Sequence, residues 1–472
     1  PAAARARPRL SESAAADTVR GEPPFYPAPP PNMKRRAFLH SAAAGGLASI
    51  AIRTAAAEKS GRRLRTALIG CGWWGGNILG EAIASGACEV VGLCDVDRRQ
   101  IAAIRERIAK VTSDQPREHR DYRELLAKEK PEIVIVATPD HWHALPVIAA
   151  VKAGAHVFVE KPIGHTIGEG RAMLNAARAA GRVVQVGTHR RTSPHTIQAR
   201  EFIRSGKVGK IGMVRCFVNN AGAGPERPSP ALPVPDGLDW DAWCGPAPLR
   251  PYSSAIHPRG FRQYLDYANG TIGDWGIHWF DQLIWITDLK WPRKIFGTGG
   301  RPIKGAPVLT ASEQTSDAPD HQMVTYDFDG LTVTWESRLF AGHNVEKGEN
   351  AGCHFYGTNG IFHLGWRGGW TFYPAKAGEP VLHEDAKLNA PDGQNIRELW
   401  ADFLDAIRTG RRPISDIEQG HLATNCSLLG VIAMRLGRSL VWDGAKERFV
   451  GDPEADQLLT RPYRPGWTYP AA

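Results

Sequence analysis

The sequence predicts an α/β protein of two folded domains: a doubly wound parallel sheet, followed by a second α/β domain built on antiparallel strands. Between residues 64 and 187, short apolar runs alternate with stretches of helical pattern, which is the order of repeated β-α-β units. From about residue 211 onward, strand-like runs follow one another without helices between them. The length of 472 residues allows two or three domains.

The first strand leads into a glycine-rich turn. Residues 64–70 favour a strand and end in the G-x-G-x-x-G run Gly70-Cys71-Gly72-Trp73-Trp74-Gly75. A helix-compatible stretch over 77–85 and a second strand over 89–94 follow, and Asp95 ends that strand 20 residues after Gly75. The glycine run alone is a weak signal, but this order and spacing predict a Rossmann-type dinucleotide-binding unit.

Each part of this unit has a chemical role. Gly70 permits the tight turn, Gly72 lets the backbone approach a pyrophosphate, and Gly75 lets helix and strand pack closely. The helix N-terminus offers free N–H groups and a positive dipole end to the phosphates. Asp95 can accept hydrogen bonds from the ribose hydroxyls and would repel a 2′-phosphate, which favours NAD over NADP. The Arg98-Arg99 pair close behind could instead bind a 2′-phosphate.

The alternation continues, so the dinucleotide-binding domain is expected over 62–187. Further strands are expected over 133–137, 156–159 and 183–187, and helices over 98–110, 122–128, 144–153 and 166–180. Ligands bind such sheets at the carboxyl ends of the strands. The polar residues at those ends are Asp95, Thr138, Glu160-Lys161 and His189-Arg190.

The second domain is expected over 188–472 and begins with a strand near 211–218. A D-G turn at Asp329-Gly330 predicts a hairpin. Further strand-like runs lie at 294–299, 322–328, 331–340, 352–357 and 361–373, and helical patterns near 395–409 and 419–438 close the domain.

A Pro- and Gly-rich insertion over 221–262 has the length of a functional loop. His257, Arg259 and Arg262 within it are candidates for binding substrate hydroxyls, although Arg259 is better interpreted as a surface residue. The Trp-rich segment Trp240–Pro246 either supplies stacking platforms for sugar rings or anchors the loop by burial of its tryptophans, and anchoring is the favoured interpretation.

Two further motifs carry a family resemblance. The first runs from Ala137-Thr138-Pro139 through His143 and His156-Val157 to Glu160-Lys161-Pro162, and the second spans 270–281 with the pattern G-x-x-x-D-x-G-x-H-x-x-D. With the glycine turn, they resemble the Gfo/Idh/MocA (glucose–fructose oxidoreductase / inositol dehydrogenase) family over residues 64 to about 465. The resemblance implies a Rossmann domain plus a C-terminal α/β domain with a large, mostly antiparallel open sheet. It also implies a homodimer or homotetramer formed through that sheet.

The resemblance further implies an NAD-dependent oxidoreductase that acts on a secondary alcohol of a carbohydrate or polyol. On a helix, Asp274, His278 and Asp281 are spaced to share one face, and Lys161 at a strand end can reach the same crevice. By resemblance, His278 is the acid/base group, Lys161 its partner, and Asp274 a substrate-binding or orienting carboxylate. Some relatives use the lysine as proton carrier, so the two roles stay open. A histidine titrates in the range that this chemistry needs.

Other site residues are expected around these three. The expected cofactor contacts are Gly70, Gly72, Trp73, Trp74, Gly75, Asp95, Thr138, Pro139, His143, Glu160 and Lys161. The expected substrate contacts are Asp274, Trp275, His278 and Arg262. Two alternatives stand beside them: His143 is equally interpretable as a helix-start residue bonded to the backbone, and Asp281 is better interpreted as structural. No metal is expected, because metal ligation needs more His or Cys nearby.

Composition excludes several other classes of protein. The net charge is +9, but residues 1–57 carry +5 of it, so no nucleic-acid partner is expected. No apolar run reaches the roughly 18–20 residues of a membrane-spanning helix. The seven cysteines are odd in number and show no CxxC, which favours small core residues over a disulfide framework.

The N-terminal segment has the pattern of a targeting signal. Residues 1–32 are expected to be disordered or an extension upstream of the true start at Met33. The run Lys34-Arg35-Arg36, a small apolar stretch over 41–52 and Ala55-Ala56-Ala57 predict a signal peptide over 33–57, of the twin-arginine type, and hence a periplasmic or exported protein. A basic amphipathic helix that stays attached is the alternative.

Three functions follow from these features. The favoured one is an exported, NAD-dependent oxidoreductase of a sugar or polyol that keeps its cofactor tightly bound. The alternative is an NAD-dependent glycoside hydrolase or lyase, which oxidises the sugar transiently and returns the hydride. A non-catalytic sugar-binding or scaffold protein is disfavoured, because Lys161 and His278 are both present.

Overall fold

The structure is a computed structural model that describes residues 62–342, 346, 348–389 and 394–471. The extension expected over 1–32 and the signal peptide expected over 33–57 lie outside the described residues. None of the helices in the described ranges is both long and apolar enough to cross a bilayer.

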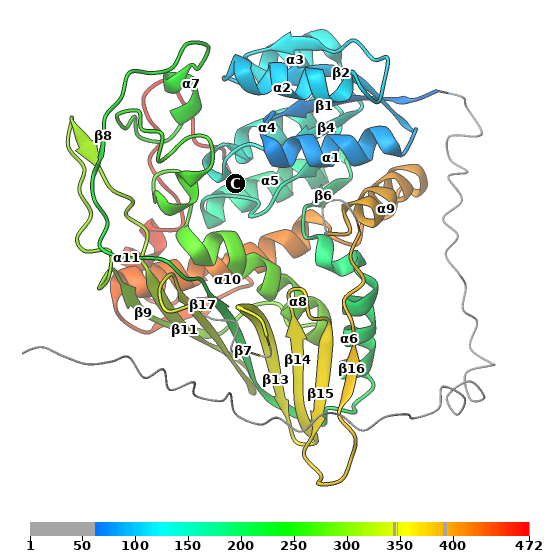
Figure 1. Ribbon diagram of the computed structural model, residues 1–472, viewed down its shortest axis with the longest axis vertical. Helices are drawn as coiled ribbons and strands as arrows, with labels where there is room; N and C mark the ends of the chain where they lie inside the picture. Colours follow the sequence, from blue (N-terminus) through cyan, green and yellow to red (C-terminus); the bar gives the residue numbers. More distant parts are fainter. Residues whose placement is uncertain (1–61, 343–345, 347, 390–393, 472) are drawn as a thin grey trace, which may run out of the picture. The chain divides into compact units, whose positions relative to one another are not determined.

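The N-terminal half contains the expected parallel sheet, with six strands in the order β3-β2-β1-β4-β5-β6 (Figure 1). The strands are β1 (Leu64–Ile69), β2 (Cys88–Cys94), β3 (Arg117–His119), β4 (Ile133–Val136), β5 (His156–Val159) and β6 (Val184–Val186). The helices are α1 (Trp73–Ala84), α2 (Arg98–Ile108), α3 (Tyr122–Glu129), α4 (Ala144–Lys152) and α5 (Ile167–Ala180). The sequence did not predict β3, because this edge strand has three polar residues and no apolar pattern.

Helices cover both faces of this sheet, which is why β4 is buried along its whole length. One face packs on α3, α4 and α5. The other packs on α1, α2 and α9 (Ile396–Thr409), where Trp400 of α9 contacts Phe158 of β5 at a ring distance of 5.7 Å. The sequence placed this last helix in the second domain. In the structure it completes the core of the first sheet, because an apolar helix face does not specify its partner.

The second sheet has ten strands in the order β16-β15-β14-β13-β7-β12-β11-β9-β17-β18. All neighbours are antiparallel except β7 and β12, which run parallel. The strands are β7 (Ile211–Asn219), β9 (Lys294–Gly300), β11 (His321–Phe328), β12 (Leu331–Arg338), β13 (Ala351–Gly357), β14 (Gly360–Gly365), β15 (Trp370–Pro374), β16 (Leu382–Glu384), β17 (Leu440–Asp443) and β18 (Arg448–Phe449). The run expected over 361–373 is a hairpin rather than one strand, because Gly369 turns the chain with a φ of +69°.

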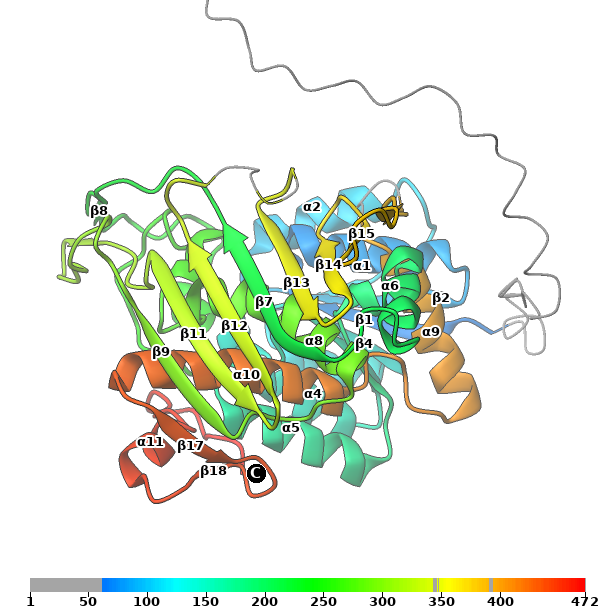
Figure 2. The same ribbon diagram turned by 90° about the horizontal axis from the view of Figure 1, so that it is seen from below.

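Three helices lie on one face of this sheet, and the other face carries no helix among the described residues (Figure 2). They are α6 (Pro194–Arg204), α8 (Ile277–Thr287) and α10 (Ile417–Leu436). Alternate residues of the strands turn toward these helices, so that a core forms between sheet and helices. All seven cysteines are buried, as expected of small core residues.

Several short elements lie outside the two large sheets. They are β8 (Ser229–Pro230), β10 (Glu313–Gln314), α7 (Trp240–Cys244), α11 (Pro453–Gln457), η1 (Asp140–Trp142), η2 (His189–Thr192), η3 (Gly260–Gln263) and η4 (Ile272–Gly276). The last of these is a turn of π-helix that leads directly into α8. Such turns are frequent at functional sites.

Candidate active site

A cavity of about 650 Å³ lies at the carboxyl ends of β1, β2, β4 and β5. The predicted residues that line it are Gly70, Gly72, Trp73, Trp74, Asp95, Thr138, Pro139, Glu160, Lys161 and Arg262. Gly75, His143, Asp274, Trp275 and His278 are not among its lining residues. The structure therefore brings most residues expected for a cofactor to one wall of one cavity.

The glycine turn has the shape of a phosphate cradle. Gly70 has a φ of +93°, and a Cβ there would lie 2.6 Å from the Ala137 carbonyl carbon. A Cβ on Gly75 would lie 2.3 Å from the Gly70 oxygen, so both positions exclude a side chain. Gly72 faces open space within 4 Å and caps α1 without a side-chain acceptor. The first-turn N–H groups of α1 therefore fit the pyrophosphate of a dinucleotide.

Asp95 stands beside this turn at the end of β2. Its Oδ2 accepts from the Cys71 N–H at 2.7 Å and its Oδ1 from the Asp97 N–H at 2.9 Å. Burial raises the pKa of Asp95 to about 6, against these backbone hydrogen bonds, which favour the carboxylate. The Arg99 guanidinium is held by Asp97, at 2.8 and 2.7 Å from its two oxygens. Arg99 is thus already paired and not free for a 2′-phosphate.

The long insertion forms the opposite wall of the cavity. The Asp239 N–H donates to the Val96 oxygen at 2.9 Å, and His257 Nε2 lies 3.0 Å from Oδ2 of Asp97. Arg259 is exposed, as expected of a surface residue, and its guanidinium also lines the cavity, 5.3 Å from the ring of Trp73. The insertion over 221–262 thus contacts the cofactor-binding domain.

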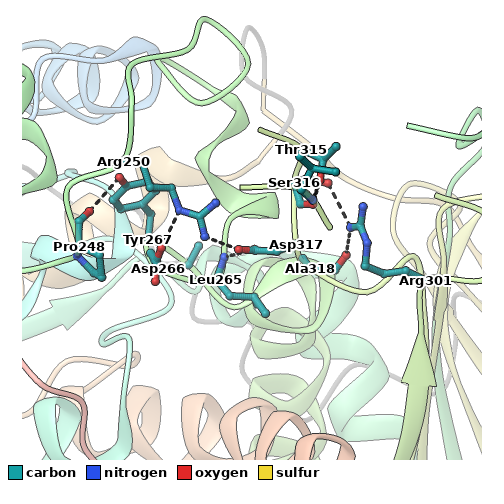
Figure 3. Close-up of polar contacts among 12 residues, drawn as sticks. Pro248, Arg250, Leu265, Asp266, Tyr267, Arg301, Thr315, Ser316, Asp317 and Ala318 are labelled. Carbon is teal, nitrogen blue, oxygen red and sulfur yellow. Dashed lines mark hydrogen bonds and ion pairs between the residues drawn. The ribbon is translucent and has the colours of Figure 1, made fainter. Parts of the chain in front are cut away.

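A buried arginine braces this insertion against the second domain (Figure 3). Arg250 Nε lies 2.6 Å from Oδ2 of Asp266, and the same guanidinium pairs with Asp317. Asp317 also accepts from the Leu265 N–H at 2.6 Å, close in sequence to Arg262. Arg301 in turn donates to the Ala318 oxygen at 2.7 Å, which fixes the segment that carries Asp317.

Lys161, Asp274 and Arg262 form one charged cluster from three separate segments. Lys161 Nζ donates to Oδ1 of Asp274 at 2.6 Å and to its main-chain oxygen at 2.8 Å, and Arg262 Nε lies 3.0 Å from the same Oδ1. Although burial opposes ionisation, the two cations hold the pKa of Asp274 well below its ordinary value. The cluster therefore fixes two cations at the cavity wall, Lys161 and Arg262, and pairs both with the carboxylate of Asp274.

His278 lies in the first turn of α8, directly after the π turn over Ile272–Gly276. It makes no hydrogen bond to Asp274 within the described structure. Its ring packs 4.9 Å from Trp366 and 5.4 Å from His189, and its Nδ1 is buried without a partner. Burial, with the charge of Lys161, lowers the pKa of His278 well below its ordinary value. The imidazole is therefore neutral, and titration near neutrality is not expected of it.

Three other predicted residues have defined surroundings. Both ring nitrogens of His143 face backbone oxygens, those of Pro162 at 2.7 Å and Thr138 at 2.8 Å, so the ring supports the two strand ends from beneath the cavity. This matches the alternative of a backbone-bonded residue. Asp281 pairs with the buried Arg191, as expected of a structural residue. Trp275 packs 4.9 Å from Trp366.

The tryptophan segment of the insertion anchors the loop. Trp240 and Trp243 are buried and stack at 4.6 Å. The favoured interpretation of this segment was therefore correct, although Trp243 also touches the cavity.

Comparison with known proteins identifies the family of this chain. Residues 64–188 match the family model described as "Oxidoreductase family, NAD-binding Rossmann fold", and residues 223–295 and 371–469 match the model of that family's C-terminal alpha/beta domain. The chain belongs to the Gfo/Idh/MocA oxidoreductase family. The expected fold, with its parallel Rossmann sheet and mostly antiparallel second sheet, is confirmed.

Three similar proteins illustrate the range of this Gfo/Idh/MocA chain's relatives. Inositol 2-dehydrogenase of Salmonella paratyphi B (strain ATCC BAA-1250 / SPB7) is 30% identical over 35% of this chain and 49% of its own length. A glycosyl hydrolase family 109 protein of Stenotrophomonas maltophilia (strain K279a) is 30% identical over 38% of this chain and 40% of its own. The chain thus spans about half or less of these curated relatives.

The third is a solved structure. The WlbA dehydrogenase from Bordetella pertussis, in complex with NADH and UDP-GlcNAcA, superposes with a TM-score of 0.59 at 17% identity. The match covers 81% of this chain and 99% of that one. At this identity the likeness concerns the fold.

Sequence reasoning missed three residues of the Gfo/Idh/MocA site. Asp140 follows the predicted Thr138-Pro139 and lines the cavity, with Oδ2 buried and unpartnered. Trp366 lies in the turn between β14 and β15, which was taken for strand. Trp467 of the C-terminal tail also lines the cavity and packs on Trp142 at 4.9 Å. Only Asp140 had a sequence signal, since it directly follows a strand end.

Proposed function

We propose that this protein is an NAD-dependent oxidoreductase that acts on a secondary alcohol of a carbohydrate or polyol. The observation that carries the proposal is the charged cluster of Lys161, Asp274 and Arg262 at the wall of the cavity that fits a dinucleotide. An ammonium group beside such a cavity is placed to hold the oxygen of a reacting alcohol.

Each residue of the site has a separate role in the proposed reaction. When bound, NAD accepts the hydride that leaves the alcohol carbon. Lys161 Nζ binds the hydroxyl oxygen and stabilises the negative charge that develops on it. We assign the role of accepting the hydroxyl proton to the neutral His278, whose imidazole lies near the charge of Lys161. Asp274 and Arg262 hold Lys161 in position.

We also propose that NAD is preferred over NADP and is held tightly. Asp95 faces the cavity as a carboxyl group, and Arg99 is already paired with Asp97, which together disfavour a 2′-phosphate. The insertion and Trp467 enclose the cavity on the side away from the parallel sheet. Such a cover slows the release of a bound dinucleotide.

Mass spectrometry of the purified protein for retained NAD(H), followed by a panel of sugars and polyols, tests the proposal. We expect retained NAD(H), and an increase in the absorbance of reduced nicotinamide when the right alcohol is added. A protein that neither retains nor binds NAD(H) at millimolar concentration contradicts the proposal.

A second candidate is an NAD-dependent glycoside hydrolase, and the similarity to the family 109 protein favours it. Here the hydride returns to the sugar after cleavage, so no net NADH accumulates. The same panel, extended to aryl glycosides, separates the two functions. Release of aglycone without any NADH favours the hydrolase, whereas NADH formation with the glycosidic bond intact favours the dehydrogenase.

We propose export by the twin-arginine route, on the basis of Lys34-Arg35-Arg36 and the small apolar stretch that follows. Replacement of both arginines, Arg35→Lys with Arg36→Lys, should leave the protein in the cytoplasm. Cell fractionation measures this, and normal periplasmic accumulation of the double variant contradicts it.

We propose a homo-oligomer formed through the helix-free face of the second sheet. Met213, Phe296, Met323 and Ile361 on this face are 37–52% exposed, an apolar surface of the kind that marks an interface. Light scattering with size-exclusion chromatography should give a dimer or tetramer that Met323→Lys weakens. A monomeric wild-type protein at micromolar concentration contradicts this.

A further inference from the structure

Two neighbouring arginines of η2 are buried to the same degree but have different surroundings. Arg190 is 3% exposed and Arg191 is 2% exposed. Arg191 is neutralised by Asp281, at 3.0 and 2.8 Å, and donates to the Ile414 oxygen. Nε and Nη1 of Arg190 are buried without a hydrogen-bond partner in the described structure. A buried charge of this kind is costly unless an anion pairs with it.

The surroundings of Arg190 leave its charge unbalanced. Its guanidinium carbon lies 3.8 Å from the ring centre of Trp366. The indole ring therefore covers one face of the guanidinium plane and leaves the N–H groups at the edge of that plane available for an anion. Burial lowers the pKa of Arg190 to about 9, with Glu349 opposing the shift and Arg367 adding to it. Glu349 forms no ion pair with Arg190 in the described ranges: its Oε1 accepts the N–H groups of Arg367 and Gly368, and its Oε2 is buried without a hydrogen-bond partner.

Arg190 is also close to the reacting group. Trp366, which stacks on Arg190, lies 4.9 Å from the ring of His278, and His189 lies 5.4 Å from the same ring. The charge of Lys161 acts on both histidines. Lys161 and Arg190 are thus both near enough to His278 to influence its charge.

We propose that Arg190 binds a carboxylate of the substrate, so that the enzyme selects a sugar acid of the uronate class over the matching neutral sugar. This inference rests on the proposed function, because it assumes that the substrate lies against Lys161. A monoanion fits better than a phosphate ester, since one guanidinium supplies the positive charge and Glu349 stands nearby.

Isothermal titration of the NAD-loaded protein tests the selection. The probes are D-glucuronate and D-galacturonate, each paired with its neutral sugar, and D-glucose 6-phosphate. We expect at least one uronate to bind about 10-fold or more tightly than its neutral partner, and more tightly than the phosphate. If neither uronate binds more tightly than its neutral sugar, or if the phosphate is preferred, the proposal is wrong.

Variants assign the effect to the residue. Arg190→Gln should weaken uronate binding about 10- to 100-fold and leave the neutral sugar unchanged, and Arg190→Lys should keep part of the preference. Arg204→Gln, the same change on the exposed face of α6, should keep the wild-type values. Circular dichroism checks folding, and the wild-type comparison decides the proposal even if Arg190→Gln does not fold. Equal losses for acid and neutral sugar in a folded Arg190→Gln protein overturn it. Uronate binding without any hydride transfer would instead refute the proposed function and leave the carboxylate site intact.

Discussion

Lys161 and Asp274 form a direct ion pair, with Nζ 2.6 Å from Oδ1, although 113 residues separate them in the chain. Lys161 follows the last residues of β5, and Asp274 lies in the π turn before α8. The pair therefore joins the parallel sheet to the helices of the second sheet. Both side chains are mostly buried, at 13% and 22% exposure, so that neither charge is well compensated by water alone.

The cofactor preference depends on Asp95. Asp95→Ala removes the carboxylate that disfavours a 2′-phosphate, so the variant should bind NAD more weakly and show a smaller gap between NAD and NADP. Fluorescence titration with both nucleotides measures the two dissociation constants. A wild-type protein that binds NADP more tightly than NAD would show that the ribose assignment is wrong.

Activity near neutral pH should depend on Asp140. Burial raises the pKa of this carboxyl group to about 7, with Arg262 and Lys161 opposing the shift and Asp274 adding to it. Above that pH the carboxylate adds negative charge beside Lys161, which disfavours the negative charge that develops on the reacting oxygen. Alcohol oxidation should therefore fall as the pH rises through about 7, and Asp140→Asn should remove this step. A pH profile of kcat/KM measures it.

The control for this change is Asp288→Asn, the same substitution at the exposed end of α8. It should keep the wild-type pH profile. An unchanged step near pH 7 in Asp140→Asn would assign the titration to another group.

The same carboxyl group should affect stability in a defined direction. Its pKa in the folded state lies above the roughly 4 of an unfolded chain, so its contribution is favourable at low pH and is lost as the pH rises through about 7. Asp140→Asn should therefore raise the free energy of unfolding above pH 7, on the order of a few kcal/mol, and have little effect near pH 4. Urea unfolding at the two pH values measures this. A variant that is less stable than wild type at pH 8 contradicts the expectation.

Arg250 should stabilise both the fold and the cofactor cavity. Arg250→Met leaves Asp266 and Asp317 without their shared cation, and we expect a loss of up to about 3 kcal/mol in unfolding free energy. Because the insertion lines the cavity, NAD should also bind more weakly. Arg293→Met, which removes an exposed pair with Asp327, is the control. Equal stability and NAD affinity in the two variants would argue against a bracing role.

Much of the first domain could be predicted because its strands are buried on both faces. A strand such as β4 is then a continuous apolar run, and the turns that follow it carry the polar residues. The spacing from Gly75 to Asp95 predicted the cavity wall for the same reason: it reflects a fixed β-α-β geometry.

The errors have physical causes as well. The titration expected of His278 assumed a typical environment, whereas burial and nearby cations lower its pKa. Trp366 was not predicted as a site residue, because the contacts of a turn residue depend on long-range packing that a local sequence pattern does not show.

Hydride transfer in a Lys161 variant tests the central claim most directly. In Lys161→Met, the rate at which an identified sugar reduces bound NAD should fall about 10²- to 10⁴-fold, because the group that holds the reacting oxygen is lost. Single-turnover absorbance of reduced nicotinamide measures the rate, mass spectrometry verifies that NAD is still bound, and Lys152→Met on the exposed surface of α4 is the control. The account predicts retained NAD with severely slowed transfer in Lys161→Met and wild-type transfer in the control. Transfer at nearly the wild-type rate in Lys161→Met would contradict it.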